Sequence, residues 1–206
     1  MPRAPQFDQA QILDAAERLI ARHGPSGATI GAIAQAVGAP TGSIYHRFDS
    51  RDVLLAEVWL GAATAFQTTF FERLAGPAPR EAGLGAALYM AQRVRERPRE
   101  ARLLLLHRRE DFVDRGWPVN MRRRADQLGR QVEAELRAFS RRLCSRQDAR
   151  TVRSITYALV EAPVAAVRRY VAAAESPPPY VDGLIRVTYE AVIRQLNVSR
   201  KGRRST

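Results

Sequence analysis

The segment from residue 38 to residue 54, GAPTGSIYHRFDSRDVL, crowds hydrogen-bonding side chains into a stretch that is rich in glycine and proline. Hydroxyl, phenol, imidazole and guanidinium groups follow one another there: Thr41, Ser43, Tyr45, His46 and Arg47. Groups of these types bond to the base edges and phosphates of nucleic acids. Their spacing therefore suggests binding rather than catalysis.

Two short helices with a glycine-containing turn are needed to position these groups. Thr29 is a suitable N-cap for a helix over 29–37, which Gly38 closes, and Pro40 suits the first turn of a helix that runs to about residue 47. This arrangement predicts a helix-turn-helix. Because the second helix is too short to be stable alone, we expect packing to hold it, through Ile44 and Phe48 against Ile12, Leu19, Ile33 and Val37.

The opposite face of this second helix is small and polar. A major groove is about 12 Å wide and admits one helix, whose N-terminal residues meet the base edges. The N-terminal amides of the helices at 29–37 and from residue 50 onward can bind phosphate oxygens, and Arg47 and Arg51 can add ionic contacts. The expected partner is double-stranded DNA.

The hydrophobic period is helical almost throughout the chain, and no strand-like alternation is present. Pro163 is expected to kink its helix. We predict an all-α fold of about nine helices. It comprises a three-helix domain over 1–50, a larger bundle over 51–197 and a basic, disordered tail over 198–206. The predicted helices cover roughly 8–22, 29–37, 40–47, 50 onward, 80–96, 98–112, 118–144, 148–174 and 179–197.

The formal net charge of +12 suggests an anionic partner, although four arginines and four acidic residues balance over the first 49 residues. The single cysteine, Cys144, excludes an internal disulfide, and the three histidines lack metal-ligand spacing. No signal peptide and no unbroken apolar run of membrane-spanning length are present. We therefore expect a cytoplasmic protein with no metal, no cofactor and no membrane partner.

Residues 9–58 resemble the DNA-binding domain of the tetracycline-repressor (TetR) family of bacterial transcription regulators. The resemblance runs through ILDAAERLIARHGPSGATIGAIAQAVGAPTGSIYHRFDSRDVLLAEV and covers about a quarter of the chain. Its G-x-x-x-G-x-[IL]-Y-x-x-F core, followed by Ser-Arg, is fairly specific. The resemblance implies an all-helical homodimer in which three N-terminal helices bind DNA and a divergent bundle binds a small effector.

Carried over by position, the resemblance places seven residues near DNA: Thr29, Thr41, Gly42, Ser43, Tyr45, His46 and Arg51. Tyr45 would contact phosphate and base edges, and Arg51 a phosphate. Many members of the family have lysine where Thr41 stands, so the contact made by that lysine is lost or replaced in this chain.

The resemblance also implies that some aromatic and polar residues of the bundle line an effector pocket, although residues of these types in a bundle are usually core. The candidates are Phe66, Phe70, Met90, His107, Phe112, Trp117, Met121, Tyr157 and Glu161. The last two helices have apolar stripes that are too rich for burial on one side, which favours a dimer interface over a single-chain core. The interface candidates are Leu159, Ala166, Tyr170, Leu184, Thr188, Tyr189 and Val192.

The predicted function is that of a ligand-responsive transcriptional regulator, a repressor that a small apolar effector releases from a palindromic operator. One alternative is an adaptor that keeps the helix-turn-helix but binds proteins. Another is an all-helical enzyme, but GPSGA and GLGAAL fall short of nucleophile and dinucleotide motifs. Cys144 also has no evident base partner.

Overall fold

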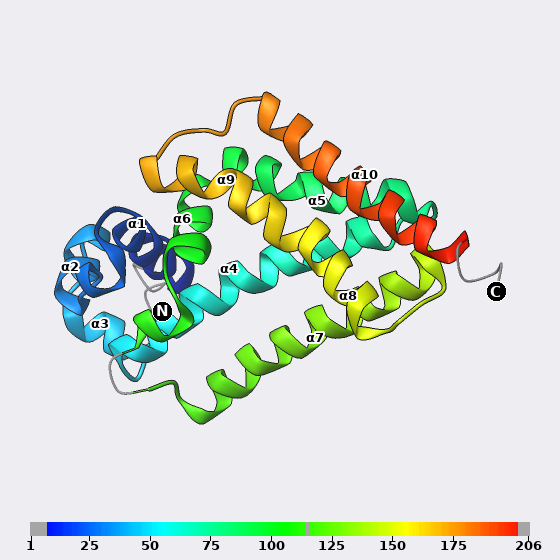
Figure 1. Cartoon of the computed structure of the whole chain (residues 1–206). Coiled ribbons are helices and arrows are strands. Elements are labelled where there is room, and N and C mark those ends of the chain that lie inside the picture. Colours follow the sequence, from blue (N-terminus) through cyan, green and yellow to red (C-terminus); the bar gives the residue numbers. More distant parts are fainter. Residues whose placement is uncertain (1–7, 114–115, 202–206) are drawn as a thin grey trace. The chain divides into compact units, whose positions relative to one another are not determined.

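The computed structural model describes residues 8–113 and 116–201, with side chains up to residue 196 (Figure 1). Within these ranges the chain forms helices and no strand, which confirms the all-α prediction. The chain packs as two compact units. Unit 1 comprises Met1–Thr64 with Arg99–Gln127, and unit 2 comprises Ala65–Pro98 with Leu128–Thr206. Two helices, α4 (Arg51–Leu74) and α7 (Val119–Cys144), have residues in both units.

Unit 1 begins with α1 (Gln9–Gly27), α2 (Ile30–Val37) and α3 (Thr41–Tyr45), which lie together at the blue end of the chain in Figure 1. Asp8 and Gln11 form a capping box at the start of α1. Gly24 has φ of 72° and interrupts α1, where a Cβ would also lie 3.5 Å from the imidazole Cε1 of His107. Glycine is therefore favoured at this position by the backbone, whereas the imidazole would only be in ordinary van der Waals contact with a Cβ.

A single apolar core holds unit 1 together. Ile44 and Phe48 are buried in it, and Leu19 and Val37 pack against it, as the sequence predicted. Leu103 of α6 (Pro98–Leu106) and Phe112 of the 3₁₀ turn η1 (Arg109–Phe112) belong to the same core. Residues far along the sequence thus complete the packing of the N-terminal helices.

Polar contacts also join the later segment of unit 1 to its N-terminal helices. The Arg102 guanidinium donates to the Ala21 carbonyl of α1 at 2.8 Å. Arg124, in the second turn of α7, forms a bidentate ion pair with Glu57 of α4. Loss of the Arg102 contact would leave a buried carbonyl without a donor, which is unfavourable. These contacts therefore hold segment 99–127 against α1 and α4. Unit 1, which contains α1–α3, is called the head below.

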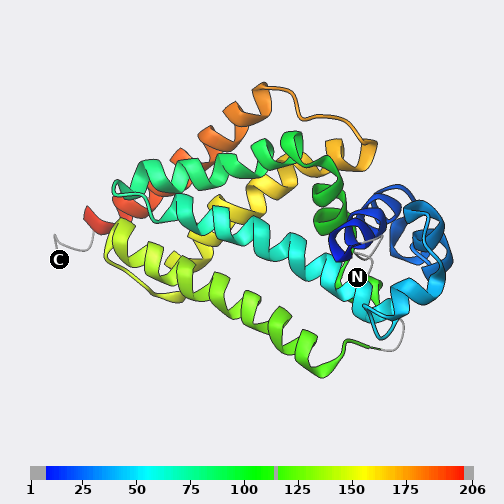
Figure 2. The same ribbon diagram turned by 180° about the vertical axis from the view of Figure 1, so that it is seen from behind.

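In unit 2, α5 (Pro79–Glu96) packs against α9 (Ala162–Ala173) and α10 (Tyr180–Lys201), as Figure 2 shows from behind. Tyr189 of α10 is fully buried, and its hydroxyl donates to the Arg80 carbonyl at 2.9 Å. A Cβ at Gly83 would lie 2.2 Å from that hydroxyl, so the approach of α10 to α5 requires glycine there. Burial raises the pKa of Tyr189.

The helix predicted over 148–174 contains a π turn just before Pro163. It consists of α8 (Ala149–Thr156), the π turn (Tyr157–Glu161) and α9. The N–H of Ala162 donates to the Tyr157 carbonyl, five residues earlier. The wider turn lies just before Pro163, which occupies the start of α9, where a missing N–H is tolerated.

Two other predicted boundaries differ from the structure. The helix over 98–112 breaks after Leu106, because the backbone at Arg108 is extended and its N–H donates to the Asp111 carboxylate at 2.7 Å. α10 continues to Lys201, beyond the predicted end at residue 197. Arginine and lysine are good helix formers, so loss of apolar residues does not end the helix. The rest of the predicted tail, 202–206, lies outside the described residues.

In the described part of the chain, α4 alone is long and apolar enough to cross a membrane by length and composition. The sequence has no unbroken apolar run of that length, yet the average hydropathy of α4 meets the criterion. Core helices of water-soluble proteins meet it too, and Leu54, Leu55 and Leu60 of α4 are buried. This property is therefore weak evidence for a membrane span.

The pKa of His107 gives a testable pH dependence. Burial lowers this pKa from its ordinary value of 6.5, with Asp111 opposing the shift and Arg102 adding to it. The unfolded chain therefore binds this proton more readily than the folded one. His107 should stabilise the fold above pH 6.5 and lose that contribution as the pH falls below it. In urea unfolding from pH 7.5 to 5, the wild type should lose stability more steeply than His107→Gln, and parallel profiles would contradict this.

Candidate DNA-binding interface

α3 presents its polar side chains outward and its apolar ones inward. Tyr45 is 55% exposed, and Thr41, Gly42 and His46 are also exposed, while Ser43 is half-buried. Ile44 and Phe48, which flank the same segment, are buried in the core of unit 1. The structure thus brings the predicted contact residues of α3 onto one accessible surface.

Local backbone conformations and hydrogen bonds define this surface despite the shortness of α3. Gly38 has φ of 74° and ends α2, and Pro40 precedes α3 in extended conformation. The N–H groups of Arg47 and Phe48 both donate to the Ile44 carbonyl, at 2.9 and 3.0 Å. The Arg47 guanidinium donates to the Ser43 carbonyl at 2.9 Å and is only partly exposed, so it lies along α3.

Thr29 has a structural role that the sequence suggested. Its hydroxyl accepts the N–H of Ala32 at 3.1 Å and caps α2. Thr29 is exposed, at the end of a helix whose dipole favours an anion. A phosphate contact near Thr29 remains a prediction.

Arg51 makes hydrogen bonds within unit 1 that the sequence did not predict. Its guanidinium donates to the carbonyls of Ala28 at 3.0 Å and Pro25 at 2.6 Å, and only 18% of the side chain is exposed. Asp52 lies 3.7 Å from the same guanidinium. Arg51 therefore connects the start of α4 to the end of α1, and its predicted phosphate contact stays a prediction.

A cavity of about 480 Å³ borders Tyr45 and the start of α4. Its walls come from Tyr45, Asp49, Ser50, Arg51, Asp52, Gly116 and Pro118. Two carboxylates and one guanidinium line it, so its walls carry a net negative charge that disfavours a phosphate. The polar face of α3 therefore offers DNA a better contact than the hollow beside it.

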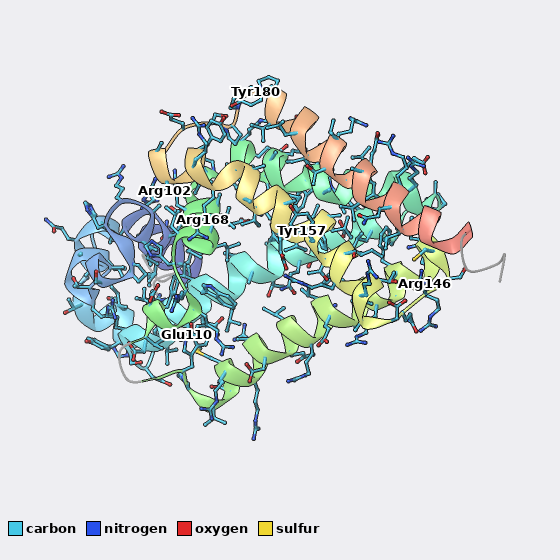
Figure 3. All side chains as sticks on the ribbon, viewed as in Figure 1. Arg102, Glu110, Arg146, Tyr157, Arg168 and Tyr180 are labelled. Carbon is cyan, nitrogen blue, oxygen red and sulfur yellow. The ribbon has the colours of Figure 1, made fainter. Side chains whose placement is uncertain are left out.

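The nine effector-pocket candidates divide between the units. His107, Phe112, Trp117 and Met121 belong to unit 1, where Phe112 is fully enclosed in the core and Trp117 packs edge-on against Trp59 at 5.5 Å. Phe66, Phe70, Met90, Tyr157 and Glu161 belong to unit 2. Phe66 and Phe70 stack at 6.1 Å, whereas Tyr157, labelled in Figure 3, is exposed and Glu161 forms an ion pair with Arg153.

The seven interface candidates also divide, this time by exposure. Leu159 and Tyr189 are buried in the chain's own core, and the buried Tyr170 hydrogen-bonds through its hydroxyl to that of Tyr180. Leu184 is 56% exposed, and Ala166, Thr188 and Val192 are partly exposed. The buried residues cannot contact a partner directly and can only hold the exposed residues in position. The sequence missed Val187, which is 65% exposed on the same face of α10 as Leu184.

Comparisons with known proteins agree with this geometry. The family model described as bacterial regulatory proteins, tetR family, matches residues 12–58. A TetR-like transcriptional regulator from Rhodococcus sp. RHA1 is 18% identical, with 95% of this chain and 99% of that one covered and a TM-score of 0.69. No curated protein matches the chain.

Two further solved structures share the fold at low identity. A transcriptional regulator FadR from Bacillus subtilis, in complex with stearoyl-CoA, is 14% identical over 90% of this chain and 98% of that one, with a TM-score of 0.67. The superantigen PfiT is 19% identical over 93% and 97%, also with a TM-score of 0.67. The family match thus identifies residues 12–58 as a DNA-binding domain of the tetR family of bacterial regulatory proteins, and the solved structures share the fold along the rest of the chain.

Proposed function

We propose that this protein is a ligand-responsive transcriptional repressor that binds a palindromic operator as a homodimer. The observation that carries the proposal is the exposed Tyr45 on a five-residue helix whose adjacent Ile44 is fully buried. A helix held from behind in this way presents its polar face to a major groove. Thr41, Gly42, Ser43 and His46 are the proposed base-edge neighbours, and Thr29 and Arg47 the proposed phosphate neighbours.

The exposed apolar face of α10 supports the homodimer. Leu184 and Val187 are more than half exposed, and Tyr180, at the start of α10 in Figure 3, is 58% exposed. Large apolar side chains that gather on one helix face usually mark an association site. A second copy of α10, with Thr188 and Val192 at the margin, would cover this face, and a two-fold axis would present two heads to one duplex about 34 Å apart.

The aromatic interior of unit 2 supports the proposal of release by an apolar effector. Its interior contains the aromatic stack of Phe66, Phe70 and Tyr89. The FadR structure of the same fold holds stearoyl-CoA, a molecule with a long apolar chain. By reciprocity, an effector that weakens operator binding must itself bind more weakly to the DNA complex.

Selection of bound fragments from genomic DNA, followed by footprinting, tests the proposal as a whole. A protected site with dyad symmetry is expected. Protection without dyad symmetry would exclude binding by two related heads. Absence of sequence preference at physiological salt would favour the protein-interaction adaptor instead, and turnover of a bound ligand would favour an enzyme.

Substitution of Tyr45 tests the interface directly. Tyr45→Ala should weaken binding to the selected operator at least tenfold, because the side chain is exposed toward the groove. Its free energy of unfolding should change by less than about 0.5 kcal/mol, as is usual for surface positions. Gel shift at 150 mM salt and urea unfolding measure the two quantities.

Two further variants serve as controls for Tyr45→Ala. Tyr157→Ala removes an exposed tyrosine from unit 2 and should leave operator affinity unchanged. Arg51→Ala removes two hydrogen bonds to carbonyls and should cost about 2–3 kcal/mol of stability. A Tyr45→Ala variant as destabilised as Arg51→Ala would show that Tyr45 packs rather than binds.

A charge placed on α10 tests the homodimer. Leu184→Glu should give a monomer in sedimentation-velocity experiments at micromolar concentration, because a carboxylate would be buried against the partner. The fold of the chain should remain, since Leu184 is exposed within it. Val119→Glu, at an apolar side chain of similar exposure in unit 1, should remain dimeric. A Leu184→Glu dimer of wild-type stability would exclude this face.

A further inference from the structure

Positive charge is divided unevenly between the two units. Unit 2 holds 20 of the 33 basic residues and 10 of the 21 acidic ones, so ten of the twelve net positive charges belong to it. In unit 1, the exposed side chains of α3 are formally neutral, and Arg47 lies along that helix. The contacts proposed between the head and DNA therefore leave most of the positive charge of the chain unexplained.

The excess charge is densest where α7 ends and α8 begins. Residues 137–153, here called the arginine corner, contain six arginines and a single carboxylate, that of Asp148. Arg146, labelled in Figure 3, lies in the loop between the two helices. Figures 1 and 2 both show this corner beside the last turns of α10, against which α8 packs. Five net positive charges are therefore gathered on one short segment.

Hydrogen bonds hold the backbone of the arginine corner in place. Ser145, which follows the last residue of α7, has φ of 57°, a left-handed conformation that is uncommon for residues other than glycine. The buried hydroxyl of Ser140 donates to the Arg146 carbonyl at 2.6 Å, and the Gln147 amide donates to the Arg137 carbonyl at 3.2 Å. The loop therefore folds back onto the last turns of α7, and this brings the arginines of the loop close to those of the helix.

The six arginines differ in the partners that they have within the chain. Three pair with a carboxylate: Arg137 with Glu133, Arg146 with Asp148 and Arg153 with Glu161. Arg142 donates to the Leu74 carbonyl at 2.8 Å and so joins α7 to the end of α4. Arg141 and Arg150 are exposed, and their guanidinium groups have no ion pair or hydrogen bond to any described residue. These two cations are available to an anion from outside the chain.

Duplex DNA is the anionic partner that best fits the corner. A guanidinium binds a phosphate group through two parallel hydrogen bonds, and duplex DNA presents phosphates along its whole length. None of the large apolar side chains that are exposed in the described residues lies within 137–153. The corner therefore lacks the apolar groups that insert into a membrane and the exposed aromatic rings on which single-stranded bases stack. The family match over residues 12–58 independently makes DNA a molecule that this protein meets.

We propose that the arginine corner binds the phosphates of duplex DNA without regard to base sequence, with Arg141 and Arg150 as the direct phosphate ligands. Arg146, which pairs with Asp148 at 3.1 Å, adds to the local positive potential. Contacts to phosphate carry no sequence information, so this surface adds affinity for any duplex. It gives unit 2 a DNA contact of its own, which retains the protein on DNA outside its operator. The inference goes beyond the proposed repressor function and does not depend on an operator.

Chemical modification of arginines tests the contact at single residues. Phenylglyoxal modification is followed by mass spectrometry with and without a random-sequence duplex of about 20 base pairs. At 50 mM KCl the duplex should slow the modification of Arg141 and Arg150 at least threefold. At 500 mM KCl this protection should disappear, because the release of counterions from the phosphates is then much less favourable.

Arg97 and Arg168 are matched controls for this measurement. Both are exposed arginines of unit 2 whose guanidinium groups also lack a partner among the described residues. Arg168, labelled in Figure 3, lies 18 residues beyond Arg150 along the continuous helix of α8, the π turn and α9, which corresponds to about 27 Å. The duplex should leave the modification of both control residues unchanged.

Substitution of the two ligands gives a second readout. In a Tyr45→Ala background, Arg141→Gln combined with Arg150→Gln should lower the affinity for the random duplex at least fivefold at 50 mM KCl, as measured by fluorescence anisotropy. Each lost phosphate contact removes about 0.9 from the slope of log affinity against log salt, so the slope should fall by about two. The unfolding temperature should not change, since no internal partner is lost. Arg97→Gln combined with Arg168→Gln should keep both the affinity and the slope.

Equal modification of Arg141 and Arg150 with and without the duplex would overturn the inference. Protection by phosphatidylglycerol vesicles or by a single-stranded oligonucleotide, but not by the duplex, would assign the corner to another partner and overturn it too. Protection that disappears when residues 198–206 are removed would place the contact in the C-terminal tail instead. A protein that selects no operator but shows the protected corner would reject the repressor and keep this inference. Operator selection with an unprotected corner would do the reverse.

Discussion

The burial of Ile44 and Phe48 is the constraint on which the DNA-binding surface depends. A helix of five residues gains too little from its own hydrogen bonds to persist in water, so its geometry comes from the core that surrounds these two side chains. Tyr45 follows Ile44 directly and so lies about 100° further around the helix. Burial of one residue thus directs the next toward solvent, and packing alone sets the orientation of the binding groups.

The packed unit that contains the helix-turn-helix includes more of the chain than helices α1–α3. Leu103 and Phe112 complete its core, and Arg102 satisfies a carbonyl of α1 from 81 residues away in sequence. Arg51 does the same for the turn between α1 and α2. The exposed face of α3 therefore depends on packing and hydrogen bonds from residues far from it in the sequence. Two continuous helices, α4 and α7, have residues both in this unit and in unit 2, where the effector is proposed to bind.

Much of the fold follows from sequence because caps and hydrophobic period are local signals. Thr29, Gly38 and the pair Ile44 and Phe48 have the structural roles that their positions predicted. Long-range contacts carry no such signal. An arginine at a helix start is typical of a phosphate ligand, and only folding brings two carbonyls to Arg51. Likewise, the hydrophobic period of α10 does not show which of its two apolar stripes faces inward. It therefore predicts the buried Tyr189 and the exposed Leu184 alike as interface residues.

The two tryptophans of the chain, Trp59 and Trp117, lie edge to face in unit 1, and Arg109 lies 5.8 Å from the ring centroid of Trp117. Intrinsic fluorescence excited at the red edge of indole absorption consequently originates entirely from the unit that contains the head. The indole bands of near-ultraviolet dichroism should report on the same pair of chromophores. Optical spectroscopy of the unlabelled protein thus observes one unit selectively, while the six tyrosines and the amide bands report on the chain as a whole.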